Sequence, residues 1–122
     1  MRHLVLILAL AGACGGDDSA DSLGVGAQCT MTAECNTSLS EICLPQFKGG
    51  YCGLEGCLHD TDCPPDSACI AHTDQHNYCF RTCLDKAECN ANRDAANEAN
   101  CSSNVTFVDP TNGRKACVPP SN

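Results

Sequence analysis

The side chains of this sequence that could do chemistry are 13 cysteines, four histidines and a few closely spaced aspartates. His72 and His76 stand four residues apart, a spacing that on a helix lets two imidazoles bind zinc. The surrounding residues are instead those of a hairpin loop, and Thr follows the first His where a zinc protease has Glu. Asp60, Asp62 and Asp66 could collect oxygen ligands around Ca²⁺, but we expect them to be solvated turn carboxylates. We therefore expect no metal or other cofactor, and these five residues remain weak metal candidates.

The cysteines themselves are the next candidates for chemistry. Zinc and iron–sulfur sites favour CxxC or CxC steps, whereas the closest pair here, Cys79 and Cys83, has three residues between its members. Nucleophilic catalysis also lacks support, because there is no GxSxG motif and no His is paired with an orienting acid at a recognisable spacing. We expect a protein that is not an enzyme and whose cysteines form disulfides.

The composition agrees with a disulfide scaffold. The chain has 122 residues, no Trp, and only three Phe and two Tyr, so we do not expect a large hydrophobic core. Its cysteine content exceeds the roughly 8–10 % that marks a disulfide scaffold, and such scaffolds persist only in oxidising compartments. Cross-links should therefore supply the stability that the core cannot.

The first residues predict a signal peptide over residues 1–13. A basic start precedes the apolar run Leu4–Ala11, which is about half the length of a membrane-spanning helix. Two kinds of peptidase site then meet at one bond, because residues 11–13 form an A-x-A site and residues 10–14 form a loose bacterial lipobox. Both sites place Cys14 at the start of the mature chain.

The parity of the cysteines favours lipidation of Cys14 over a plain secreted chain. Removing Cys14 from the 13 cysteines leaves an even number that can pair completely. Acyl chains on Cys14 would anchor the protein to a membrane, and the small, acidic residues that follow predict a flexible tether over residues 14–28. Gly15, by resemblance to bacterial lipoprotein sorting, favours the outer membrane. The alternative location is secretion.

The charge of the chain limits its partners. The mature chain would carry six basic and 15 acidic residues, a formal charge of −9. Such a surface repels nucleic acid and anionic lipid head groups, so we expect no nucleic-acid partner. Arg114 and Lys115 are the only adjacent basic pair, and we expect them to close a hairpin.

Twelve cysteines fall into three units of four with a common pattern. Five residues separate the first two cysteines of every unit, and an acidic residue, Glu34, Asp62 or Glu88, stands before the second. Tyr51 and Tyr78 precede the fourth cysteine of the first two units. This short period indicates a linear array in which each unit stacks on its neighbours. We expect unit 1 at residues 29–56, unit 2 at residues 57–82, and a longer terminal unit 3 at residues 83–122.

Turn signals predict that each unit ends in a hairpin that carries its third and fourth cysteines. In unit 3 we expect strands at 105–108 and 115–118 around a turn at 109–113. An isolated hairpin is marginal in water and needs bonds to the segment that holds the first two cysteines. This favours pairing first with third and second with fourth, among about ten thousand connectivities. The predicted bonds are Cys29–Cys43, Cys35–Cys52, Cys57–Cys69, Cys63–Cys79, Cys83–Cys101 and Cys89–Cys117.

Two further stretches have local signals. The Ala- and Asn-rich residues between Asp85 and Asn100 predict either a short helix with Asp85 as N-cap or a polar loop enlarged by insertion. Asn36 and Asn104 begin N-glycosylation motifs, which matter only in a eukaryotic secreted protein. With the hairpins, these elements predict a small disulfide-rich fold of short β-hairpins and loops, with three tandem four-cysteine units and little regular secondary structure.

The C-x5-C steps, the acid before each second cysteine, Pro64 after one of them and the Tyr–Cys closings resemble the cysteine-rich repeats of bacterial surface lipoproteins. They are also similar to EGF-like modules and to the N-terminal cysteine-rich region of Dickkopf proteins. EGF modules have six cysteines and a CxC step, which this chain lacks. The resemblance covers Cys29–Cys117, and it implies an architecture but no ligand-binding residue.

We therefore expect a non-catalytic, lipid-anchored interaction or structural module at the bacterial cell surface. Its membrane contact would be the acyl chains on Cys14, and its partner would be a protein or a glycan. The alternative is a small secreted disulfide-rich inhibitor, for example of proteases. Such an inhibitor would present the loop Ala71–Asn77 or the loop Pro45–Gly50.

Overall fold

In the computed structural model, the described part of the chain comprises residue 22, residues 24–110 and residues 113–122. The predicted signal peptide, the lipidation site Cys14 and most of the predicted tether lie outside these residues. Within the described residues, no helix is both long and apolar enough to cross a bilayer.

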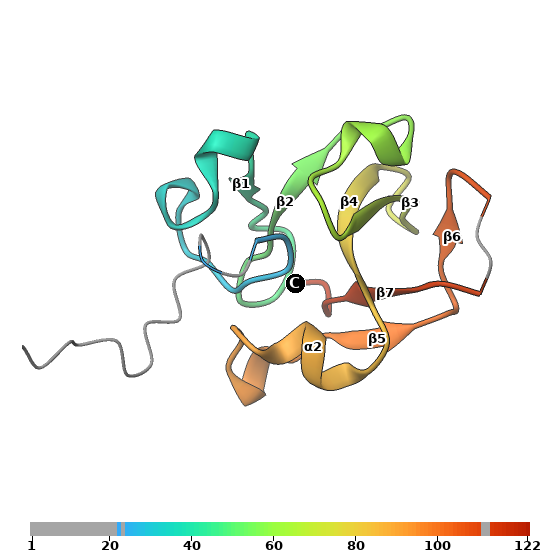
Figure 1. The fold of residues 1–122 in the computed structure, drawn as a ribbon. Coiled ribbons are helices and arrows are strands. Elements are labelled where there is room, and N and C mark those ends of the chain that lie inside the picture. Colours follow the sequence, from blue (N-terminus) through green and yellow to red (C-terminus); the bar gives the residue numbers. More distant parts are fainter. Residues whose placement is uncertain (1–21, 23, 111–112) are drawn as a thin grey trace, which may run out of the picture.

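Short strands, the short helix α2 and 3₁₀ turns make up the regular structure (Figure 1). The strands are β1 (Ile42–Cys43), β2 (Cys52–Glu55), β3 (Ser67–Ala71), β4 (Asn77–Cys83), β5 (Asn100–Ser102), β6 (Thr106–Phe107) and β7 (Lys115–Val118), and α2 is Lys86–Asn90. The 3₁₀ turns are Thr32–Glu34, Thr37–Leu39, Asp60–Asp62 and Ala95–Asn97. The predicted class, a small disulfide-rich fold with little regular secondary structure, is confirmed.

Two disulfides hold each unit, one from the first cysteine to the third and one from the second to the fourth. The bonds are Cys29–Cys43, Cys35–Cys52, Cys57–Cys69, Cys63–Cys79, Cys83–Cys101 and Cys89–Cys117, the same pairs as in the predicted set. The Cα atoms of the first bond are 5.9, 5.9 and 6.0 Å apart in units 1 to 3, and those of the second are 5.5, 5.5 and 5.3 Å apart. The longer unit 3 therefore repeats the cystine geometry of the other two.

The third and fourth cysteines of each unit face each other across two antiparallel strands. The facing pairs are Cys43 and Cys52, Cys69 and Cys79, and Cys101 and Cys117. Each of these cysteines is bonded to an earlier cysteine and not to the one that it faces. Both strands of every hairpin are thus fastened to the segment that precedes them, which compensates for the low intrinsic stability of a two-stranded hairpin.

The strand prediction for unit 3 is wrong in one respect. β6 does not pair with β7, because Phe107 of β6 lies opposite Ile70 of β3 in unit 2, while β7 pairs with β5 and β4. The Val108 amide extends the contact with unit 2 by donating to the Cys69 carbonyl oxygen at 3.0 Å. β6 thereby satisfies backbone groups along β3 that would otherwise form an open sheet edge.

All three units contribute to one shared hydrophobic core, beside a smaller cluster around the cysteines of each unit, so the expected linear array is also wrong. Phe47 of unit 1 has its ring centroid 5.1 Å from that of Tyr78 and 5.5 Å from that of Phe80, both in unit 2. The Tyr51 ring centroid lies 5.9 Å from that of Phe47 and 5.1 Å from that of Phe80. The buried members of this core are Val25, Leu44, Phe47, Tyr51, Ile70, Tyr78, Phe80 and Ala116. The few aromatic residues are therefore concentrated at one place and not divided among the units.

Arg93 of unit 3 fastens units 1 and 3 together. Its side chain is largely buried, with 8 % of the residue exposed, and burial lowers its pKa. It donates to the carbonyl oxygens of Gly26, Lys48, Gly50 and Asn97 at 3.3, 2.7, 2.7 and 2.8 Å. These hydrogen bonds satisfy loop carbonyl groups that face the interior.

The last residues of the predicted tether belong to the folded body. Val25 and Ala27 are each only 3 % exposed. The Gly26 amide donates to the Cys52 carbonyl oxygen at 2.8 Å, and the Cys52 amide donates to the Ala27 carbonyl oxygen at 2.9 Å. The prediction of a flexible tether as far as residue 28 is therefore wrong, because this end of it packs against β2.

The stretch after Asp85 contains a short helix, which is the first of the two predicted alternatives. Asp85 is the N-cap of α2, since its Oδ1 accepts a hydrogen bond from the Glu88 amide at 3.1 Å. The helix places the buried Cys89 against Cys117, to which it is bonded. After α2 the chain continues through loops and one 3₁₀ turn as far as β5.

Candidate functional site

The acidic residue before the second cysteine of each unit has a structural role. In unit 1, Glu34 Oε1 accepts hydrogen bonds from the backbone amides of Thr30 and Met31 at 2.9 and 3.0 Å. Asp62 accepts from the two equivalent amides of unit 2 at 2.9 and 3.0 Å. In unit 3, Glu88 accepts a hydrogen bond at 3.4 Å from the backbone amide of the residue that follows the first cysteine. The carboxylate thus closes the turn between the first two cysteines, which gives the repeated acidic position a physical reason.

These hydrogen bonds favour the ionised form of the carboxylates. The pKa of Glu34 is lowered chiefly by the Thr30 hydroxyl, which donates at 2.6 Å, and then by the two amides. The pKa of Asp62 is lowered first by the Leu58 amide and then by the His59 amide. Asp62, a calcium candidate in the sequence, therefore uses its carboxylate to hold its own loop.

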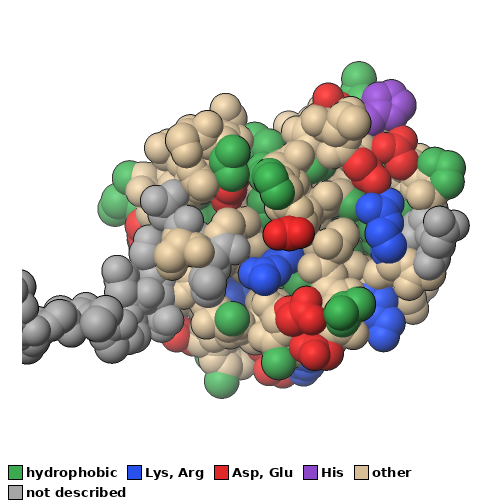
Figure 2. Space-filling view, viewed as in Figure 1, with side chains coloured by type: hydrophobic (Ala, Val, Ile, Leu, Met, Phe, Trp, Pro, Cys, Tyr) green, Lys and Arg blue, Asp and Glu red, His purple; other side chains and the backbone are tan. Residues whose placement is uncertain are grey.

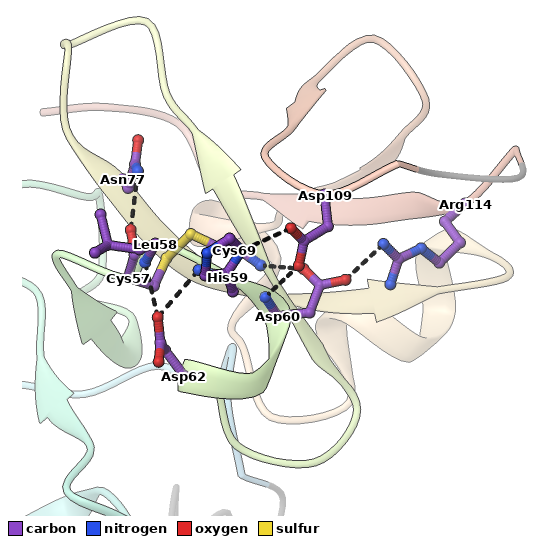
Figure 3. A network of polar contacts seen from close by, with 9 residues as sticks. All are labelled: Cys57, Leu58, His59, Asp60, Asp62, Cys69, Asn77, Asp109 and Arg114. Atoms are coloured by element: carbon purple, nitrogen blue, oxygen red, sulfur yellow. Dashed lines mark hydrogen bonds and ion pairs between the residues drawn. A yellow bond between two sulfur atoms is a disulfide. The ribbon is translucent and has the colours of Figure 1, made fainter.

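Asp60, the neighbouring calcium candidate, belongs to a polar network that joins units 2 and 3 (Figure 3). Its Oδ1 accepts from the Cys69 amide at 2.9 Å, and its Oδ2 lies 2.8 Å from Arg114 Nη2. Asp109 of unit 3 accepts from the Asp60 amide at 2.7 Å and lies 3.0 Å from His59 Nδ1. The carboxylate of Asp60 is therefore directed at an amide and a guanidinium of the protein.

His59 and Asp109 form an exposed imidazole–carboxylate pair within this network (Figure 3). The pKa of His59 is raised, chiefly by its hydrogen bond to Asp109. The pKa of Asp109 is lowered by the amide of Asp60 first and by His59 second. The pair fastens the loop after β6 to unit 2, and sequence reasoning missed it because the two residues are far apart in the chain.

The other three metal candidates, Asp66, His72 and His76, do not form a cluster with Asp60 and Asp62. Asp66 is exposed, the His72 ring lies 5.5 Å from Phe47, and His76 Nδ1 lies 3.3 Å from Glu55 Oε1. In the described part of the chain, the groups of three His, Cys, Asp or Glu whose ligand atoms lie within 4.8 Å of one another consist of cysteine sulfurs alone. Those sulfurs are bonded in disulfides, so they are not thiolate ligands.

A hollow of about 670 Å³ lies between units 2 and 3, over β4, α2 and β7 (Figure 2). Three basic side chains line it, those of Arg81, Arg114 and Lys115. β4 and β7 bring them together, because their pairing sets Cys83 opposite Lys115. The sequence contained no sign of this arrangement. Arg114 and Lys115 do not close a hairpin between β6 and β7 as expected, because those strands pair elsewhere.

One of the two loops proposed for an inhibitor is turned into the protein. Phe47, at the centre of the loop Pro45–Gly50, is 1 % exposed. Gly50 has a φ of +70°, and a Cβ there would lie 2.0 Å from the Cys29 carbonyl oxygen, so only glycine fits. Phe47 thus anchors this loop in the core, and Pro45 and Lys48 are its exposed residues.

The other inhibitor loop, Ala71–Asn77, projects from the end of β3 and β4 with an exposed tip at residues 73–76. Asp74 braces it, because its carboxylate accepts from the His76 amide at 3.0 Å and from the Tyr78 hydroxyl at 2.6 Å. Burial, followed by the hydrogen bond to Asp74, raises the pKa of Tyr78 to about 12. The loop is therefore an exposed turn with a fixed base.

Comparison with known proteins does not place the chain in a family, since no family model, curated protein or solved structure matches it. The resemblance to lipoprotein repeats, EGF-like modules and Dickkopf regions thus stays a prediction from cysteine spacing.

Proposed function

We propose that this protein is a non-catalytic interaction module of the bacterial cell surface, anchored by acyl chains on Cys14. The observation that carries the proposal is the single body formed by six disulfides and one shared core. Disulfides at this density persist outside the reducing cytosol. An acyl anchor would hold such a body at a membrane and leave its faces accessible to a partner.

The use of the polar side chains supports binding over catalysis. Glu34 and Asp62 hold their own turns, and Asp60 is paired with Arg114. Two of the groups that the sequence offered for chemistry, Asp60 and Asp62, are thus engaged in fixing loops. The exposed loop Ala71–Asn77 and the hollow between units 2 and 3 remain as surfaces suited to recognition.

The intact mass of the protein from its native host, measured before and after reduction, tests the anchored form. We expect the added mass of acyl chains on Cys14 and a gain of about 12 Da on reduction, because six disulfides take up 12 hydrogens. A Cys14→Ser variant should lose the acyl mass and leave the membrane fraction, with the same gain on reduction. A wild-type mass without acyl chains, or with several free thiols, would overturn the proposal.

A secreted inhibitor is the second candidate, and the braced loop Ala71–Asn77 is the observation that favours it. A broad protease panel tests it directly with the wild-type protein. If the loop inhibits, Asp74→Ala should weaken inhibition, because it removes the brace from the His76 amide and the Tyr78 hydroxyl. Absence of inhibition across the panel would exclude this candidate.

A further inference from the structure

Basic residues are scarce in this protein, yet three of them meet at one hollow. The chain has seven Lys and Arg against 15 Asp and Glu. Arg81, Arg114 and Lys115 line the hollow between units 2 and 3. Figure 2 shows basic and acidic side chains gathered on the middle of this face. The lining sets these three cations against the carboxylates of Asp66 and Glu88, so the hollow is less negative than the rest of a chain with a formal charge of −8 and repels an approaching carboxylate less.

One cation of the hollow, Arg114, is positioned by side-chain contacts. Arg114 Nη2 lies 2.8 Å from Asp60 Oδ2, and its Cζ lies 4.9 Å from the centroid of the Phe107 ring. These two contacts fix the direction of the guanidinium group. Lys115 begins β7 and lies opposite Cys83 of β4. A cation that is held in place before binding loses little conformational entropy when a carboxylate arrives, and a planar guanidinium suits a carboxylate well.

Acidic and apolar side chains also line the hollow, and they limit the kind of ligand that it can bind. Asp66 and Glu88 line it, and so does Leu84, which is 83 % exposed. These two carboxylates repel a polyanion such as nucleic acid or a heavily sulfated glycan. They can, however, accept hydrogen bonds from the N–H groups of a ligand. Among the described residues that line the hollow there is no aromatic side chain on which a sugar ring could stack.

We propose that this hollow binds an acidic peptide segment of a partner protein, an inference that rests on the proposed interaction function. The carboxylate of the peptide lies between Arg81, Arg114 and Lys115. Peptide N–H groups face the two carboxylates of the hollow, and an apolar side chain beside the acidic residue contacts Leu84. The volume of about 670 Å³ is within the range of roughly 300–1,000 Å³ for ligand sites, so it suits a short segment better than a lone anion.

Titration of the ¹⁵N-labelled protein with the tetrapeptide acetyl-Gly-Leu-Glu-Gly-amide tests the proposal by NMR. We expect saturable shifts of the backbone amides at residues 81–84 and 113–115. The same peptide with Gln in place of Glu should bind at least about tenfold more weakly, because it lacks the charge. Lys115→Glu should weaken binding by about fivefold or more. Lys48→Glu makes the same charge change away from the hollow and should leave the affinity within about twofold.

Several outcomes would overturn the inference. These are no saturable shifts at millimolar peptide, equal affinity for the Glu and Gln peptides, or equal weakening by Lys115→Glu and Lys48→Glu. Sodium acetate that reproduces the same shifts with the same affinity would show a simple oxyanion site and would exclude the peptide as the specific ligand. Native-like spectra of both variants before titration ensure that weaker binding reflects the lost charge and not a lost fold.

Failure of this inference is distinguishable from failure of the proposed function. Chemical cross-linking on intact host cells reports whether the anchored protein has a surface partner, and Lys115→Glu reports whether the hollow is the contact. Cross-links that persist in Lys115→Glu would overturn the hollow as the binding site and leave the interaction function standing. Loss of the same cross-links in Lys115→Glu, but not in Lys48→Glu, would support both.

Discussion

The Tyr51 hydroxyl donates a hydrogen bond of 2.9 Å to the carbonyl oxygen of Cys117. Tyr51 closes the hairpin of unit 1, and Cys117 is the last cysteine of unit 3. The same hydroxyl accepts a hydrogen bond of 3.0 Å from the Arg81 amide of unit 2. A single buried hydroxyl therefore has partners in both other units, and burial raises its pKa above the usual range.

We predict that Tyr51→Phe destabilises the whole protein by about 1–3 kcal/mol, because it removes the partner of a part-buried amide and of a buried carbonyl group. Tyr78→Phe is the matched control. The Tyr78 hydroxyl contacts the side chains of Asp74 and Gln46, which can turn toward water, so we expect a smaller loss. Denaturant unfolding with the disulfides intact measures both. An equal effect of the two substitutions would contradict a special role for the Tyr51 hydroxyl.

The turn carboxylates make stability depend on acidity in a defined direction. The pKa values of Glu34 and Asp62 are lowered in the folded protein by the hydrogen bonds that they accept. Their stabilising effect is therefore complete above the unfolded pKa values of about 4 and is lost as the pH falls through the folded values. We predict that Glu34→Gln and Asp62→Asn lower the Tm at pH 7 by a few degrees, and that the difference from wild type shrinks below about pH 3.

Asp66→Asn is a suitable control for these variants. It removes one negative charge, as they do, and Asn tolerates the φ of +62° that Asp66 adopts. The backbone carbonyl oxygen of Asp66, which accepts from the Thr82 amide at 2.9 Å, is present in both residues. If Asp66→Asn lowers the Tm as much as Asp62→Asn does, net charge and not turn closure is responsible.

The cysteine pattern predicts the local part of the fold well and the arrangement of the units poorly. Pairing within a unit follows from short-range turn signals, since a hairpin with two cysteines must be fastened to the segment before it. The packing of Phe47 against Tyr78 depends on contacts between units, and spacing along the chain carries no information about them. The same limit applies to β6, whose pairing with β3 replaces the local partner β7. The hollow depends in turn on the pairing of β4 with β7, so it was also beyond the reach of sequence reasoning.

The His59–Asp109 pair predicts a local effect of pH on the loop after β6. The pKa of His59 is raised in the folded protein, so its stabilising effect is complete below the unfolded pKa of about 6.5 and is lost as the pH rises through the folded value. The pKa of Asp109 is lowered in the folded protein, so the stabilising effect of Asp109 is lost only as the pH falls through its folded value. We expect hydrogen-exchange protection of the Val108 amide, corrected for intrinsic rates, to be about twofold to fivefold greater at pH 5 than at pH 8.

His59→Gln separates this effect from a general effect of pH, since Gln does not titrate. The variant should show nearly equal corrected protection of the Val108 amide at the two pH values. Asp60 and Asp62 also act on the charge of His59, so the variant is better compared with wild type than with substitutions of those acids. A pH dependence that survives unchanged in His59→Gln would show that another group controls the loop.

The shared core predicts that the three units unfold together, unlike the members of a linear array. Phe47 contacts the rings of Tyr78 and Phe80 from unit 1, so Phe47→Ala removes packing from two units at once. We expect it to cost about 3–5 kcal/mol and to reduce the exchange protection of β2, β4 and β7 by the same free energy. Leu58→Ala, at a side chain that is 67 % exposed, should change stability by less than about 0.5 kcal/mol. Loss of protection confined to β2 in Phe47→Ala would mean that unit 1 unfolds by itself, and the units would then be independent modules held side by side.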